Sequence, residues 1–292
     1  MKNQYNKHLI ELLLATLLIS TSGVLGRYID LPSPVIIWWR CILGSLFLYL
    51  FCRYKKYSFK VHSKKDVSRI VLSAIFLGTH WITYFYALKL SNVALGMLSL
   101  FTFPVITAFL EPLFSRTKLD IIHVFLGILV LVGIYILAPE FDFESSQVKG
   151  ILLGIFSAFC YALRNLILKG QVGRYNGTVL MTYQISILSV VLLPFVFVLG
   201  TKNIDTQFPY VILLALFTTA IGHSLFIHSF KNFSVSTASI INSLQPVLGI
   251  IMAYVFLKEI PSVNTFIGGS LILVTVIVES FRSRRYLQGN RN

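Results

Sequence analysis

Charged residues are scarce in this 292-residue chain, at 12% of the total, and only 11 residues are acidic. Soluble globular domains carry about 25% charged residues, so the composition excludes an ordinary soluble domain. Hydrophobic residues instead make up 56% of the chain, and the mean hydropathy is +0.78. The composition therefore predicts a membrane protein.

Cysteine is also rare, with Cys41, Cys52 and Cys160 far apart and inside apolar segments. An odd, scattered set of this kind favours buried apolar side chains over a disulfide framework or a metal site. The sequence has no glycine-rich phosphate loop, no His-Glu-x-x-His pattern and no G-x-S-x-G turn. We therefore expect no enzyme activity, no metal site and no cofactor.

Basic residues outnumber acidic ones and give a formal net charge of +14. Almost all of them fall in the loops between apolar stretches, where they suit anionic lipid headgroups better than a nucleic-acid groove. We therefore expect the lipid bilayer as a partner and no nucleic acid.

Ten apolar stretches are long enough to cross a bilayer, which takes about 20 helical residues. They fall at residues 9–29, 35–52, 67–88, 93–114, 121–138, 150–168, 178–199, 208–230, 235–257 and 263–281. The first has no small-residue cleavage pattern, so we interpret it as a retained span and not a signal peptide.

The distribution of Lys and Arg over the loops predicts the orientation. The N-terminus and the loops after even-numbered spans hold 18 of these residues, and the other side holds 5. The positive-inside rule therefore predicts a multi-pass protein of the cell membrane with both termini and the 53–69 loop in the cytoplasm. The acidic 140–144 segment is expected outside, between the two halves.

One sequence pattern occurs twice, 142 residues apart. The identical pairs are Lys89 and Lys231, Val93 and Val235, Pro104 and Pro246, Val105 and Val247, and Phe114 and Phe256. This pattern indicates an internal duplication. Because each half holds five spans, an odd number, the halves must have opposite orientations, as in many secondary transporters.

The predicted fold class is therefore an all-α membrane protein with ten transmembrane helices, arranged as two inverted five-helix repeats. Residues 1–147 form the first repeat and residues 148–292 the second.

The residues also resemble the drug/metabolite transporter superfamily, in its ten-helix EamA branch. The resemblance rests on the paired prolines, Trp39-Arg40 in the second span, the ending Leu257-Lys258-Glu259 of the ninth, and Gly127, Gly133, Gly268 and Gly269 in the last span of each half. The first half departs from the pattern, because Arg116-Thr117 replaces the acidic ending and Glu111 lies inside the helix instead.

The resemblance implies a secondary transporter of small metabolites, such as amino acids or related solutes, often working outward. It also implies a central cavity lined by the first, third, fourth, sixth, eighth and ninth spans. The alternatives are a passive facilitator or channel, and an intramembrane enzyme acting on lipid or isoprenoid headgroups. The glycines of the fifth and tenth spans are compatible with a homodimer contact or with packing inside one chain.

Polar side chains deep in a membrane are costly and therefore mark candidate sites. His80 lies about twelve residues into the third span, with Trp81 beside it and Tyr84 one turn further on the same face. One interpretation is a cavity wall with an apolar face and a few polar groups. The other is a histidine that bonds a neighbouring helix while the aromatic rings pack.

The candidate substrate-binding residues are polar or aromatic side chains inside the spans. They are His80, Trp81, Tyr84, Ser99, Phe103, Tyr161, Asn165, His223, Asn242 and Gln245. Six of them, namely His80, Trp81, Tyr84, Tyr161, His223 and Gln245, are expected within about three turns of the membrane midplane and facing one central cavity. Pro104 and Pro246 are candidates for helix kinks or gating, because a proline inside a helix frees a carbonyl and permits bending. Arg40 and Glu111 lie nearer the span ends, where they are expected to extend toward an interface or to pair there. For Arg164 this interpretation and a place at the site, with Asn165 beside it and Tyr161 one turn away, are equally open.

Overall fold

The computed structural model describes residues 2–115, 120–137, 145–260 and part of 262–282. These residues form helices joined by turns, with no strand in the part of the chain so described. The all-α class predicted from composition and periodicity is therefore confirmed. The acidic 140–144 segment and Arg116-Thr117 lie outside the described residues.

The first half contains α1 (Lys2–Tyr28), α2 (Ser33–Tyr54), α3 (Lys64–Leu90), α4 (Val93–Leu100), α5 (Phe103–Ser115) and α6 (Ile121–Leu137). The second contains α7 (Ser146–Lys169), α8 (Gly177–Val191), α9 (Leu193–Leu199), α10 (Ile204–Leu213), the π-helix η1 (Leu214–His223), α11 (Ser224–Ser229), α12 (Val235–Asn242) and α13 (Gln245–Leu257). The described residues between 263 and 282 are also helical.

Polar residues that precede five of the helices cap the helix N-termini. Ser63, Asn92, Ser145, Asn176 and Ser234 each accept a hydrogen bond from a backbone N–H two or three residues further along. Such caps satisfy N–H groups that have no partner inside the helix. Two of the capped helices begin before the predicted apolar stretches: α3 begins at Lys64 and not at 67, and α7 begins at Ser146 and not at 150.

Seven of the described helices are long and apolar enough to cross a membrane, and an eighth span results if α8 and α9, which meet at 40°, are counted together. Apolar side chains on the outside of the bundle are widely exposed, such as Leu46 at 52%, Phe197 at 79% and Phe256 at 70%. A soluble protein would bury such surface, whereas a bilayer covers it. The chain is therefore a multi-pass membrane protein.

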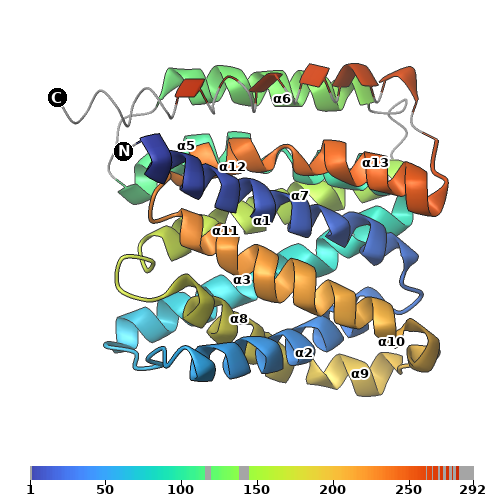
Figure 1. Ribbon diagram of the computed structural model, residues 1–292. Coiled ribbons are helices and arrows are strands. Elements are labelled where there is room, and N and C mark those ends of the chain that lie inside the picture. The colour runs from blue at the N-terminus through green and yellow to red at the C-terminus, as the bar shows by residue number, and fades with distance from the viewer. Residues whose placement is uncertain are drawn as a thin grey trace.

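The helices lie roughly side by side and alternate in direction (Figure 1). The long helix α3 packs along α7, α1 contacts η1 and α13, and α2 contacts α8. In Figure 1, α6 runs along one edge of the bundle, and α2 with α9 runs along the opposite edge. The interior of the bundle is therefore built around α1, α3 and α7.

Two of the spans are broken at matching positions. α4 ends at Leu100 and α5 begins at Phe103, while α12 ends at Asn242 and α13 begins at Gln245. Pro104 and Pro246 each occupy the second residue after a break, where the missing N–H costs no intrahelical bond. Each of the two spans is therefore interrupted just before the proline at which a kink was predicted, and a role of the prolines in gating stays a prediction.

Candidate functional site

A small cavity of about 20 Å³, room for roughly one water molecule, lies among six of the predicted spans. Seven of the candidate residues line it: His80, Trp81 and Tyr84 from α3, Phe103 from α5, Tyr161 from α7, His223 from η1 and Gln245 from α13. The spans that contribute are the first, third, fourth, sixth, eighth and ninth.

His80 serves both as a cavity wall and as a link between helices. Its Nδ1 lies 2.7 Å from the hydroxyl oxygen of Ser157 on α7, and that hydroxyl donates to the backbone carbonyl of His80 at 2.8 Å. The serine proton is used in the second bond, so Nδ1 of the imidazole donates in the first. In the neutral ring Nε2 is then an acceptor for a donor group of a bound solute.

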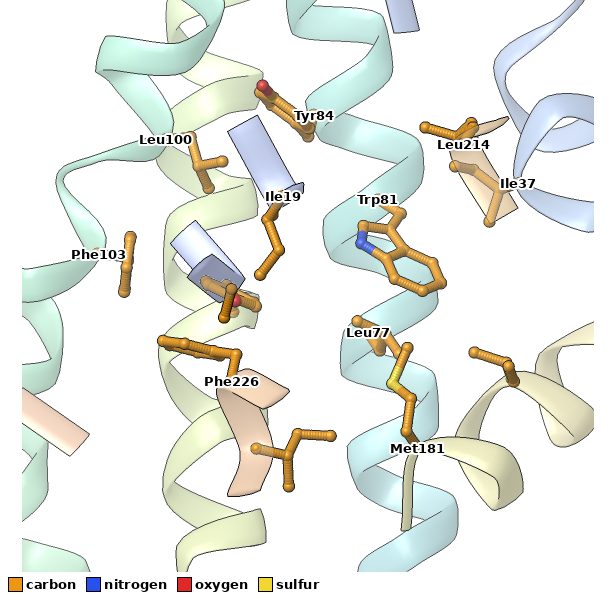
Figure 2. Close-up of a cluster of buried hydrophobic side chains, with 14 of the residues drawn as sticks. Ile19, Ile37, Leu77, Trp81, Tyr84, Leu100, Phe103, Met181, Leu214 and Phe226 are labelled. Carbon is orange, nitrogen blue, oxygen red and sulfur yellow. The ribbon is translucent and has the colours of Figure 1, made fainter. Parts of the chain in front are cut away.

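Aromatic rings form most of the cavity wall. The ring centre of Tyr161 lies 4.3 Å from that of His80 in a stacked arrangement and 5.0 Å from that of Phe103 edge to face. Trp81 meets His223 edge to face at 5.3 Å. Figure 2 labels Trp81 and Tyr84 of α3 and Ile19 of α1, which all line the cavity. The wall thus offers an apolar surface to a solute.

Polar side chains of η1 and α13 also belong to the wall, and Asn242 of α12 lies directly behind it. The side-chain nitrogen of Gln245 donates to Oδ1 of Asn242, which also accepts from the Thr16 hydroxyl at 3.1 Å. His223 Nδ1 and Asn242 Nδ2 are buried without a hydrogen-bond partner. Buried polar atoms are usually satisfied. Because His223 lines the cavity, its unpartnered nitrogen leaves bonding capacity for a ligand there.

Three of the candidate residues do not line the cavity. The Ser99 hydroxyl donates to the carbonyl of Leu95 in its own helix and packs against Gly154 of α7, where any side chain would collide with it. Asn165 accepts a hydrogen bond from Arg164, and Asn242 lies behind Gln245. For Ser99 in particular, helix packing replaces the predicted contact with a solute.

Arg40 is the main residue whose position the sequence misjudged, and for Arg164 the interfacial interpretation was wrong. Both are fully buried, so neither extends toward a membrane surface. Arg40 lies 3.9 Å from the centre of the Trp81 ring, and Arg164 donates to Gln184 at 2.7 Å. The position of a residue along its span does not by itself show whether it is exposed at an interface. The neighbouring helices cover both arginines at that depth.

A polar cluster joins α1, α3, α4 and the end of α13 at one end of the bundle. Arg27 donates to the carbonyls of Leu88 and Lys89 at 3.1 and 2.9 Å, which are at the C-terminus of α3. Glu259 accepts from the backbone N–H of Val93 at the start of α4 and lies 3.7 Å from Arg27. We call these residues the Arg27 cluster.

A second cluster of the same design lies at the opposite end of the bundle (Figure 1). Lys169 of α7 donates to the carbonyls of Phe230 and Phe233, after the end of α11. Glu111 accepts from the backbone N–H of Val235, at the start of α12, at 2.9 Å. We call these residues the Lys169 cluster. Its basic residue, carbonyl and capped N–H each follow their counterparts in the Arg27 cluster by 142 residues.

A central cavity walled by aromatic and polar groups between membrane-crossing helices is a feature of membrane transport proteins. The chain belongs to the EamA-like transporter family, whose model matches residues 7–138 and 148–281. The resemblance inferred from the prolines and helix endings is thereby confirmed.

Relatives support the same class. The chain is 25% identical over 275 residues to the uncharacterized transporter YxxF of Bacillus subtilis, covering 91% of this chain and 86% of that protein. It is 22% identical over 277 residues to the pseudopaline exporter CntI of Pseudomonas aeruginosa, covering 92% and 95%. By family and relatives, the protein is a membrane transporter and not an enzyme.

The fold is shared with a solved structure. A protein crystal structure superposes with a TM-score of 0.78 at 17% sequence identity, over 96% of this chain and 99% of that one. At this level of identity the likeness concerns the fold alone.

Proposed function

We propose that the protein is a secondary transporter that exports a small polar metabolite by alternating access. The observation that carries the proposal is the cavity shared by six spans, with a polar cluster at each end of the bundle. The sequence has no ATP-binding motif, so the driving force is a gradient of the solute or of a coupled ion. The small volume of the cavity fits a closed state between two open ones.

The matching clusters support the proposal of ten spans in two inverted repeats, residues 1–147 and 148–292. Arg27 is in the last turn of α1 and Lys169 in the last turn of α7, at equivalent positions of the two halves. These two helices end at opposite ends of the bundle (Figure 1). An inverted duplication produces this arrangement, whereas a parallel duplication would put both at the same end. The helix breaks before Pro104 and Pro246 also fall at equivalent positions of the two halves.

The proposed orientation has both termini on the cytoplasmic side of the cell membrane. The 18-to-5 distribution of Lys and Arg supports it. The Lys169 cluster then faces the cytoplasm and the Arg27 cluster faces outside. In alternating access each cluster separates only when the cavity opens on its side, so the two act as inner and outer gates.

The proposed substrate is an amino acid or a related solute. His80 and Gln245 would hydrogen-bond it, while Trp81, Tyr84 and Tyr161 would cover its apolar part. Hydrogen-bonded recognition discriminates well, because a wrong solute leaves buried polar groups unpaired. The relative named as a pseudopaline exporter supports the outward direction.

The test is transport by the purified protein in proteoliposomes. Uptake and counterflow are measured against a panel of amino acids and nucleosides, with and without a pH step across the membrane. A carrier gives saturable flux and accumulation of labelled solute against an unlabelled internal pool. Non-saturable flux without counterflow would contradict the proposal and favour a channel or passive facilitator.

A further inference from the structure

Two positive charges are buried beside the cavity without a negative partner. Arg40 and Arg164 are both 0% exposed, and neither contacts a carboxylate among the described residues. A charge taken out of water is unfavourable unless it is paired, and hydrogen bonds to neutral groups compensate only in part. The interior of the bundle therefore holds two charges that lack compensation.

Arg40 lies directly behind the indole ring of Trp81, which lines the cavity. Its Nε and Nη2 donate to the hydroxyls of Thr219 and Thr218, each at 2.9 Å, and its Nη1 has no partner. All partners of this guanidinium are uncharged. One donor group is still free, at a point one side chain away from the cavity.

Arg164 occupies a similar place behind Tyr161. Its guanidinium carbon is 5.9 Å from the centre of the Tyr161 ring. Its Nη groups donate to Asn165 at 3.0 Å and Gln184 at 2.7 Å, and its Nε has no partner. Again the partners are neutral, because both are amide side chains. Gln184 in turn donates to the hydroxyl of Ser73 at 2.9 Å.

Each guanidinium group lies beside an aromatic ring that lines the cavity, Arg40 beside Trp81 and Arg164 beside Tyr161. No Asp or Glu belongs to the lining. Charges act over longer distances in a low-dielectric interior than in water, and walls lined by one sign of charge concentrate the opposite ion. The potential in the cavity is therefore positive.

We propose that the transported solute is an organic anion that carries at least one carboxylate. Arg40 and Arg164 attract it and compensate its charge, while the aromatic wall holds its apolar part and His80 Nε2 accepts from a donor group on it. The inference rests on the proposed function, because it names the substrate class of the same cavity. It excludes a cationic solute, which two unpaired guanidinium groups would repel.

The test compares carboxylates with neutral amides of the same shape. The purified protein is heated with glutamate or glutamine, succinate or succinamide, and benzoate or benzamide, at constant ionic strength. We expect at least one carboxylate to raise the Tm at millimolar concentration, and its amide to need at least tenfold more for the same shift. Equal or stronger stabilisation by the amides, or none by any carboxylate, would overturn the proposal.

Variants identify the source of the preference. Arg40→Gln and Arg164→Gln should each reduce the preference for the carboxylate about tenfold, while Arg40→Lys and Arg164→Lys should retain most of it. Arg53→Gln is the matched control, because Arg53 is exposed at the end of α2. If both Gln variants keep the full preference, the two arginines are not its source. If the Gln variants do not fold, the comparison of carboxylates with amides on the unmodified protein still tests the anion proposal.

Transport measurements separate this inference from the proposed function. If only neutral or cationic solutes show counterflow, the protein is still a transporter, but the anion proposal is overturned. Carboxylate binding to the cavity without saturable flux of the bound solute would support the anion site and overturn the transport proposal.

Discussion

The carboxylate of Glu111 caps helix α12, accepting a hydrogen bond from the backbone N–H of Val235 at 2.9 Å. The neighbouring N–H of Ser236 donates to the other carboxylate oxygen at 3.0 Å. An anion at a helix N-terminus satisfies unpaired N–H groups and interacts favourably with the helix dipole. The contact joins the first half of the chain to the second.

Removing this cap should open the cavity toward the cytoplasm. Loss of a helix cap costs about 0.5–2 kcal/mol, and about 1.4 kcal/mol corresponds to a tenfold change in an equilibrium. Glu111→Ala should therefore increase the inward-open population about two- to thirtyfold. The measurement is the rate at which a cysteine at Ser22, on the cavity wall, reacts with an impermeant thiol reagent applied from the inside, in a chain lacking the three native cysteines.

Glu259→Ala provides the opposite control for the gate assignment. It removes the cap from Val93 in the Arg27 cluster, so labelling of the same cysteine should rise from the outside instead. If both variants increase labelling from the same side, the two clusters do not act as inner and outer gates.

Pro246→Ala should slow transport several-fold and lower the stability by less. The substitution supplies an N–H that lets a continuous helix form across the break before Gln245, while loss of a compatible proline costs only about 0.4–1 kcal/mol. Counterflow rate and Tm are measured on the same preparation. Pro209→Ala, within α10, is the control. If the folded Pro246→Ala variant transports at the unmodified rate, the proline contributes to packing and not to transport.

His80→Ala should raise the apparent KM about tenfold or abolish flux, with expression and membrane insertion unchanged. A hydrogen bond to the solute contributes about 0.5–1.5 kcal/mol, more if the solute group is charged. Thr83→Ala, on the same helix, is the control, because the Thr83 hydroxyl bonds only carbonyls of its own helix. An unchanged KM for the His80 variant would refute its assignment to the substrate site.

The orientation can be tested without a substrate. Cysteines introduced singly at Lys64 and Lys202, both exposed, should react with an impermeant thiol reagent from opposite faces of the membrane. Lys64 is expected on the cytoplasmic side, because its loop belongs to the basic set. Reaction of both from one face would contradict the alternating topology and the inverted repeats.

The sequence predicted much of the cavity, because depth in a hydrophobic span is visible in the chain itself. His80, Tyr161, His223 and Gln245 lie far from the ends of their apolar stretches, and all four line the cavity. Ile19, Ser22, Leu100 and Phe101 also line it and were missed. Side chains of that kind occur throughout the spans, so only the packing of α1 against its neighbours distinguishes them.

Composition and periodicity by themselves determined that this chain is helical and crosses a membrane, because both follow from which residues tolerate lipid and at what spacing they recur. Only the tertiary structure decided the surroundings of its charges. Arg40 and Arg164 resemble interfacial arginines in the sequence, yet Trp81, Tyr161 and the threonines of η1 enclose them. In the sequence, Glu111 is an acidic residue inside a helix and not at its end, yet its side chain bonds the start of α12, 124 residues away in the chain. Burial and partners depend on which helices meet. Some of the deciding contacts, such as Arg40 with Thr219 and Glu111 with Val235, join residues more than a hundred positions apart.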